Sequence, residues 1–107
     1  MKDETKRPWG EYKVIEKIKI IDVNPNSRLS LQYHINRDEF WRIIRGKGIV
    51  TIDKKQFKAK EGDSYKIPRK VVHRIEAKEE GISFLEIATG DIDEGDVVRL
   101  EDDYMRI

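Results

Sequence analysis

The chain contains two histidines, His34 and His73, and polar side chains of types that bind metals lie close to the first of them. Gln32 lies two positions before His34, Glu39 follows after a short turn, and the chain has no cysteine. Two imidazoles, a carboxylate and an amide oxygen make an N/O donor set that suits a divalent metal and leaves positions open for water or substrate. We expect Gln32, His34, Glu39 and His73 to hold one divalent ion, with Zn as first choice and Co, Mn, Fe or Ni as alternatives.

Strands must position these side chains, because apolar and polar residues alternate from Glu11 onward. In the segment 29–34, Gln32 and His34 project to the same face. Glu39 opens the next strand, and His73 lies on a distant one that follows a proline turn. No segment has a sustained 3.6-residue period with caps, so the pattern predicts an all-β sandwich or barrel. A jelly roll would bring these strands together.

The pattern predicts nine or ten short strands in one domain that spans residues 1–107 and begins with a charged arm at residues 1–7. Glycines at Arg45–Gly48 predict one hairpin, and Lys54–Lys55 predicts another. The expected strands are 12–16, 17–23, 29–34, 39–45, 48–53, 56–60, 64–67, 72–77, 82–89 and 97–100.

Charge and hydropathy exclude several classes of protein. The 22 Lys and Arg nearly balance the 21 Asp and Glu, which leaves a net charge of +1 and no electrostatic case for nucleic acid or an anionic membrane. No apolar run approaches the roughly 20 residues of a membrane span, and the first residues do not resemble a signal peptide. We therefore expect a cytoplasmic protein, and its Lys, Glu and Ile content is typical of a thermophilic source.

The four polar residues could also line a hydrogen-bonded barrel interior that holds no metal. A buried carboxylate beside two imidazoles is costly without a counter-charge, and this cost favours the metal.

The spacing of these residues resembles the two motifs of the cupin superfamily. The first motif matches Gln32, His34, Glu39 and Gly46, with Gln in the slot of the first His. The second matches Gly62, Pro68 and His73, with Lys70 in place of a Gly and Ala77 in place of an Asn. The resemblance implies a cupin jelly roll.

A narrower resemblance extends over most of the chain, from Arg7 to Arg106. The segments 7–10, 29–34, 37–41, 67–68, 73–74 and 98–106 resemble the C-terminal isomerase domain of type II phosphomannose isomerases. The chain departs from that family at Asn36 and Phe40, where it commonly has His, and at Met105, where it commonly has Gly. The resemblance implies a stand-alone cupin that interconverts mannose-6-phosphate and fructose-6-phosphate. Because of these departures, we expect weak activity or a changed substrate.

Aldose–ketose isomerisation needs a base for the C2 proton and a cation for the phosphate. The candidates for the first role are Lys66, Asp103 and Tyr104, and those for the second are Arg28 and Arg99. Arg28 lies an even number of positions from Gln32, which would place it on the ligand face. Trp41 shares its face with Glu39 and is expected to line the substrate site, and the resemblance adds Arg106 to the substrate-binding residues.

The main alternative function is a non-catalytic module that binds a metal and a sugar phosphate, which Asn36 and Phe40 favour. A metal-dependent oxygenase is a third possibility, although a Gln in one ligand slot speaks against it. Leu29, Leu31 and Tyr33 lie on the face opposite the expected ligands. Such an apolar face needs a cover, either the N-terminal strands or a second subunit, and we expect a homodimer.

Overall fold

The computed structural model of the protein describes residues 4–15, 17–91, 93 and 95–105, and within them it contains nine strands and no helix. It therefore has no helix that could cross a membrane in the described part. The strands are β1 (Glu4–Arg7), β2 (Gly10–Ile15), β3 (Ile18–Val23), β4 (Leu31–Tyr33), β5 (Arg37–Ile52), β6 (Lys55–Lys60), β7 (Ser64–Ile67), β8 (His73–Gly90) and β9 (Val98–Glu101).

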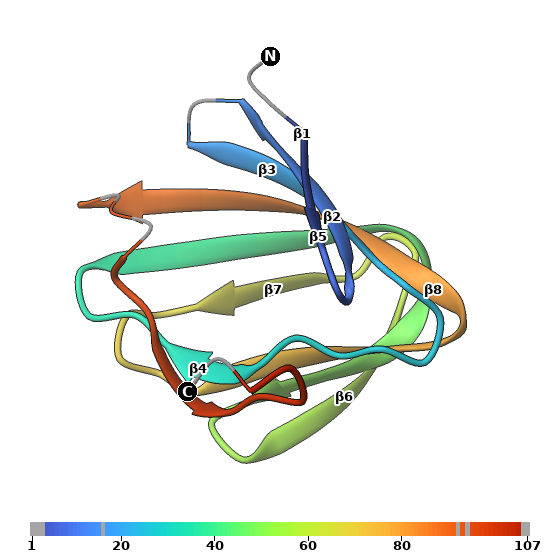
Figure 1. The fold of residues 1–107 in the computed structure, drawn as a ribbon. Helices are drawn as coiled ribbons and strands as arrows, with labels where there is room; N and C mark the ends of the chain where they lie inside the picture. Colours follow the sequence, from blue (N-terminus) through green and yellow to red (C-terminus); the bar gives the residue numbers. More distant parts are fainter. Residues whose placement is uncertain (1–3, 16, 92, 94, 106–107) are drawn as a thin grey trace.

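All strand pairs are antiparallel, and together they form one curled sheet (Figure 1). One path through the sheet runs β1-β2-β3-β8-β4-β9, and β5 joins it by pairing with β8, β6 and β7. The two longest strands, β5 and β8, pair from Arg37 with Gly90 to Ile52 with His73. This curled antiparallel sheet confirms the all-β jelly-roll prediction.

Strands β5 and β8 are each longer than the sequence pattern predicted. The hairpin expected at Arg45–Gly48 is wrong, because β5 continues through it with register shifts at 43/45 and 46/48. Gly46 has a φ of 88°, and a Cβ on it would lie 2.2 Å from the carbonyl oxygen of Gly81 on β8. The glycines therefore permit a bend with close backbone contact, as in a β-bulge, instead of a chain reversal.

The hairpin between β5 and β6 is confirmed. Its two turn residues are Asp53 and Lys54, one position earlier than expected, and both have positive φ angles, 49° and 70°. Two successive positive φ values are typical of the type I′ turn, whose twist matches that of the flanking strands.

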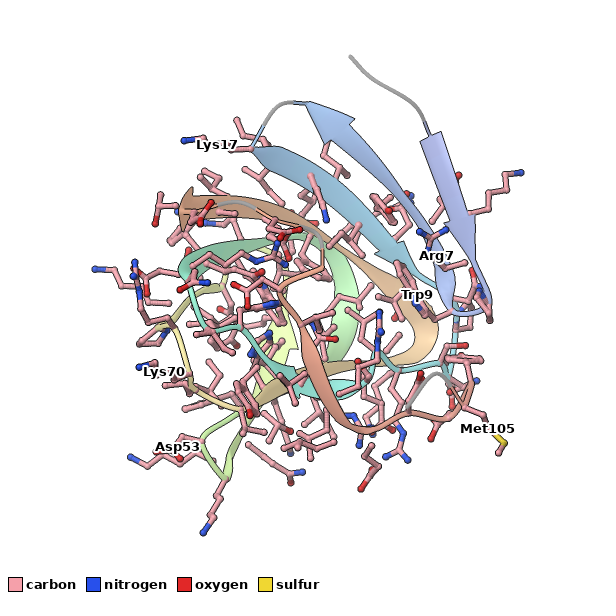
Figure 2. The ribbon with its side chains drawn as sticks, turned by 60° about the vertical axis from the view of Figure 1, so that its left-hand side comes forward. Arg7, Trp9, Lys17, Asp53, Lys70 and Met105 are labelled. Atoms are coloured by element: carbon pink, nitrogen blue, oxygen red, sulfur yellow. The ribbon has the colours of Figure 1, made fainter. Side chains whose placement is uncertain are left out.

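The described part of the expected charged arm, residues 4–7, forms the strand β1 and pairs with β2. Trp9 lies in the turn that follows β1 and is buried in the core, which explains how this short hairpin is held against the barrel. In Figure 2 Trp9 lies inside the molecule, whereas Lys17 and Asp53 project outward.

The apolar core lies between the walls of the curled sheet and includes Trp41, Ile43, Val50, Ile75 and Phe84. Each such side chain contributes about 1.5–3 kcal/mol through burial. Trp41 joins this core to polar residues, because its ring centroid lies 4.6 Å from that of Phe84 and 5.5 Å from that of His73.

Leu29 does not share the outer face expected for it. It precedes β4, so strict alternation does not reach it, and it packs against the core. The register of β4 against β9 also shifts between Leu31 and Gln32.

Candidate metal and substrate site

Three of the four expected metal ligands come together in the interior. His34 directly follows β4, Glu39 lies on β5 and His73 begins β8. One nitrogen or oxygen atom from each lies within 4.8 Å of the others, and all three side chains are buried. The Nε2 atom of His34 is 3.2 Å from Oε2 of Glu39, and Nε2 of His73 is 3.9 Å from Oε1.

Backbone carbonyls orient both imidazole rings. His34 donates from Nδ1 to the carbonyl of Asp96 at 2.6 Å, and His73 donates from Nδ1 to the carbonyl of Val71 at 3.0 Å. In the neutral form of each ring, a proton on Nδ1 leaves Nε2 with the lone pair that a metal would need. The carboxylate of Asp96 also accepts from the backbone N–H groups of Ile35 and Asn36, which holds the turn after His34 in place.

Gln32 lies beside this cluster, directly opposite His73 in the β4–β8 pair. Its amide nitrogen lies 3.4 Å from Nε2 of His34, and its amide oxygen accepts a hydrogen bond from Ser30. A half-turn of the amide would direct its oxygen to the imidazoles. The structure therefore places Gln32 within reach of a metal held by the other three residues, and its role as a ligand stays a prediction.

The donor set fits a divalent ion. Nε2 of the buried His73 has no hydrogen-bond partner in the part of the chain that the structure describes, and a buried polar atom without a partner is costly unless a ligand binds it. Two imidazole nitrogens and a carboxylate also match the ligands that Zn²⁺ and related ions take in open sites.

Sequence reasoning missed Arg37, which supplies a counter-charge inside the site. Its guanidinium donates to Oε2 of Glu39 at 3.0 Å, and Nη2 lies 3.3 Å from Nε2 of His34. Trp41 donates from its indole N–H to Oε1 of Glu39 at 3.0 Å. Arg37, Glu39 and Trp41 are two positions apart along β5, so strand alternation could have placed all three on one face.

These partners determine the charge of Glu39. Burial raises the pKa of its carboxyl, but the hydrogen bond to His34 and the charges of His34, His73 and Arg37 outweigh burial and lower the pKa. Burial lowers the pKa of His73 in spite of Glu39. The site thus holds an ionised carboxylate beside a histidine that favours its neutral, metal-binding form.

Glu86 is a second buried carboxyl that sequence reasoning missed. Burial and the neighbouring charge of Glu39 raise its pKa well above the ordinary value, and Lys19, its partner in the β3–β8 register, offsets this only in part. Glu86 and Glu39 share a hydrogen bond. The pair therefore favours one proton on Glu86 next to an ionised Glu39.

The free energy of unfolding of the metal-free protein is expected to fall as the pH rises, and Glu86→Gln is expected to abolish this fall. The folded pKa exceeds the ordinary 4.5, so the folded state holds a proton that the unfolded chain releases. The stability from this group is complete below the unfolded pKa and is lost as pH rises through the folded pKa. Urea unfolding between about pH 5 and 9 measures this slope. The exposed Glu79→Gln should leave it unchanged, and an equal slope in Glu86→Gln would contradict the assignment.

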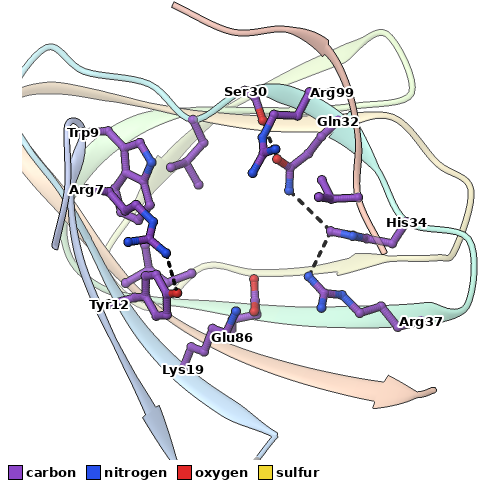
Figure 3. A pocket seen from close by; sticks show the side chains of 13 residues that line it. Arg7, Trp9, Tyr12, Lys19, Ser30, Gln32, His34, Arg37, Glu86 and Arg99 are labelled. Carbon is purple, nitrogen blue, oxygen red and sulfur yellow. Dashed lines mark hydrogen bonds between the residues drawn. The ribbon is translucent and has the colours of Figure 1, made fainter. Parts of the chain in front are cut away.

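A cavity of about 190 Å³ opens beside the cluster (Figure 3). One side carries Gln32, His34 and Arg37, and the other carries residues of the N-terminal strands and their turn. Its lining consists of Arg7, Trp9, Tyr12, Lys19, Ile21, Leu29, Ser30, Gln32, His34, Arg37, Glu86, Val97 and Arg99.

The other sequence candidates lie in different places. Arg99 lines the cavity, and its Nε is buried without a hydrogen-bond partner. Arg28 instead pairs with Asp103 through two hydrogen bonds of 2.7 and 2.8 Å, and neither residue lines the cavity. Trp41 is buried next to His73 and contacts the site through Glu39.

Lys66 and Tyr104 do not line the cavity either. Lys66 is exposed on β7 and borders a separate, mostly apolar hollow with Phe40 and Ile87. Tyr104 is half-buried against the apolar core. Arg106 lies outside the described residues.

Comparison with known sequences gives one family and several relatives. The profile of the family described as mannose-6-phosphate isomerase C-terminal matches residues 1–102. The alginate biosynthesis protein AlgA of Pseudomonas aeruginosa is 38% identical over 110 residues, which cover 96% of this chain and 23% of AlgA. The mannose-1-phosphate guanylyltransferase ManC of Salmonella typhimurium is 35% identical over 114 residues, which cover 100% of this chain and 24% of ManC. The chain thus spans about a quarter of the length of these relatives.

Solved structures share the fold at low sequence identity. KdgF from Halomonas superposes with a TM-score of 0.80 at 14% identity, covering 88% of this chain and 91% of KdgF. The cupin domain of Schizosaccharomyces pombe Cnp3 gives 0.71 at 15% identity, covering 76% and 64%. Bacillus subtilis oxalate decarboxylase gives 0.76 at 24% identity, covering 92% and 30%. These similarities confirm the cupin fold.

Proposed function

Since the chain belongs to the mannose-6-phosphate isomerase C-terminal family, we propose that it is a metal-dependent isomerase that interconverts an aldose phosphate and a ketose phosphate. The proposed pair is mannose-6-phosphate and fructose-6-phosphate. The observation that supports this most is that His34 and Arg99 line the same cavity. His34 lies next to the buried Glu39 and His73, and the buried Nε of Arg99 has no hydrogen-bond partner among the described residues.

In this proposal His34, Glu39 and His73 hold one divalent ion, with Gln32 as a fourth ligand. The ion, Zn²⁺ or another of the five candidate metals, would supply Lewis-acid polarisation of the sugar oxygens. The described part of the chain then has two tasks: to move a proton between C1 and C2, and to hold the phosphate.

Glu86 is the residue best placed for the proton. It is the only carboxyl group among the described residues that line the cavity, and it lies in contact with Glu39. In its ionised form it would take the C2 proton as the C1–C2 double bond forms and the electrons of the C1 carbonyl move to O1. It would then deliver a proton, exchangeable with solvent, to C1 as the O2 proton passes to O1 and the C2 carbonyl forms. Lys66, Asp103 and Tyr104, the candidates from sequence, lie outside the cavity lining.

Arg99 is expected to hold the phosphate, and Arg28 is not. Arg99→Ala should raise KM about 10- to 100-fold with little change in kcat, because a charge-assisted contact present in both ground and transition states is lost. Arg28→Ala should leave KM unchanged, since Arg28 pairs with Asp103 away from the cavity. Steady-state kinetics on mannose-6-phosphate compares the two, and equal effects would contradict this assignment.

The experiment that tests the function loads metal-free protein with Zn, Co, Mn, Fe or Ni in turn and assays conversion of mannose-6-phosphate. Isomerisation in deuterated water should place deuterium at C2 of the aldose or C1 of the ketose. Binding of mannose-6-phosphate without conversion under any of the five metals would instead support a non-catalytic binding module. Two observations favour that second candidate: Arg37 neutralises Glu39 without a metal, and Phe40 departs from the family pattern.

We also propose that the protein is a homodimer. Arg99 faces the cavity, so its neighbour Leu100, which is 50% exposed, lies on the outer face of β9. Val98, two positions from Leu100, pairs with Tyr33, and Leu31 lies two positions from Tyr33, which extends this apolar face onto β4. Light scattering at micromolar concentration should give twice the chain mass, and Leu100→Lys should shift it towards a monomer. A stable wild-type monomer would contradict the proposal.

A further inference from the structure

The N-terminal strand β1 contributes an arginine to the cavity. Arg7 donates from Nη2 to the hydroxyl of Tyr12 at 3.0 Å and from Nη1 to the carbonyl of Lys6 at 3.1 Å. Its guanidinium carbon lies 5.2 Å from the centroid of the Tyr12 ring. These contacts orient the guanidinium and leave other N–H donors for a ligand.

The charges on the cavity lining are uneven. Four cationic side chains line it, Arg7, Lys19, Arg37 and Arg99, against the single carboxyl of Glu86. Arg37 pairs with Glu39, and Lys19 lies opposite Glu86. No described carboxylate forms an ion pair with Arg7 or Arg99. Two guanidinium groups without an anion in one cavity are suited to a bound anion, and a planar guanidinium matches the geometry of phosphate.

The position of Arg7 agrees with the shape of a hexose phosphate. In such a sugar the reacting C1 and C2 atoms lie at the opposite end of the carbon chain from the phosphate on C6. The phosphate must therefore be held across the cavity from His34 and its neighbours. Figure 3 shows Arg7, with Trp9 and Tyr12, on the side opposite His34 and Arg37, and Arg99 between the two sides.

We propose that Arg7 on β1 and Arg99 on β9 together bind the phosphate of the substrate, which makes the N-terminal hairpin part of the substrate site. This proposal rests on the proposed function for the identity of the sugar, and it concerns binding alone. One phosphate group would then be bound by residues from both ends of the described chain.

The test measures dissociation constants by calorimetry on the zinc-loaded full chain, with mannose-6-phosphate and inorganic phosphate as ligands. Arg7→Gln should weaken binding of mannose-6-phosphate about 10- to 100-fold, and binding of inorganic phosphate should weaken as well. The matched control is Lys6→Gln, which removes the same charge from the neighbouring position, whose side chain points to the other face of β1. This control should bind both ligands as the wild type does. Arg7→Lys keeps the charge but loses the planar fork, and it should be intermediate.

Zinc affinity is the readout that separates binding from structure. If Arg7→Gln binds zinc normally but binds the phosphates weakly, the proposal is supported. If it binds mannose-6-phosphate as tightly as Lys6→Gln does, or if zinc and phosphate binding are lost together in both Arg7 variants, the proposal is wrong. Binding that depends on Arg7 without any turnover would refute the isomerase and leave the phosphate site standing. Turnover with an unchanged KM in Arg7→Gln would support the isomerase and refute the role of Arg7 in phosphate binding.

Discussion

Replacing His73 with alanine is expected to weaken the affinity for Zn²⁺ by more than about 100-fold. Loss of a group that merely orients a ligand costs about 10- to 100-fold, and His73 is itself the residue whose buried Nε2 has no other partner. Zinc titration with a competing chelator measures the affinity. The melting temperature is a second readout, because an ion that binds only the folded state raises it. Zinc should raise it in the wild type and leave it unchanged in His73→Ala.

The control for this variant is Val72→Ala, which shortens the neighbouring side chain and leaves the donor set intact. It should keep both the affinity and the zinc-dependent rise in melting temperature. A His73→Ala protein with wild-type zinc content would refute the assignment of the donor set. In the proposed isomerase, removing the metal should also lower kcat far more than it raises KM, since negative charge on the sugar oxygens develops only towards the transition state.

Replacing Glu39 with glutamine is expected to destabilise the metal-free protein by about 3–5 kcal/mol, the usual cost of removing one partner of a buried ion pair. The change removes the carboxylate that accepts from the guanidinium of Arg37 at 3.0 Å, and that guanidinium belongs to a side chain that is only 6% exposed. Urea unfolding measures the difference. Arg37→Met combined with Glu39→Gln should cost less than the sum of the two single changes, because both single changes remove the same contact between the guanidinium and the carboxylate. Additive costs would show that the pair is not coupled.

The same variant has a predictable pH dependence. The folded pKa of Glu39 is lowered from its ordinary 4.5, so its ionised form stabilises the folded state above that value. This stability is lost as pH falls from the ordinary pKa through the folded pKa. The difference between the wild type and Glu39→Gln should therefore be constant at neutral pH and shrink in acid.

The sequence could predict the cluster because motif spacing reports strand geometry directly. Gln32 and His34 share a face by alternation, and the jelly-roll expectation placed Glu39 and His73 next to them. It could not predict which charges pair inside the barrel. Arg37 lies two positions from Glu39 and therefore shares its face of the strand, but this spacing does not show which side chains form an ion pair. The counter-charge that seemed to be lacking in a metal-free interior is in fact present on the same strand.

Long-range contacts account for the other differences. The even spacing of Arg28 from Gln32 indicated an inward side chain, but Asp103, 75 positions away, binds it at the surface. The glycines at 46 and 48 were consistent with a turn, and only the approach of the opposite strand shows that they permit a bend. The strand β1 was missed because its residues are almost all charged, and its pairing with β2 cannot be inferred from apolar alternation.

The register of the two long strands shows that the site joins the two ends of the β5–β8 pair. Glu39 pairs with Ala88 and Ile52 pairs with His73, so 52 − 39 = 13 positions of β5 separate the two points. At about 3.3 Å per residue a straight strand would span about 43 Å, more than the 33 Å extent of the whole molecule. Yet Nε2 of His73 lies 3.9 Å from Oε1 of Glu39. The β5–β8 ribbon bends back until its two ends lie close together, and an ion held by both side chains would tie the ends of one ribbon to each other. An ion bound at this point would therefore hold the curvature of the ribbon, whose residues Arg37 and Glu86 also line the cavity.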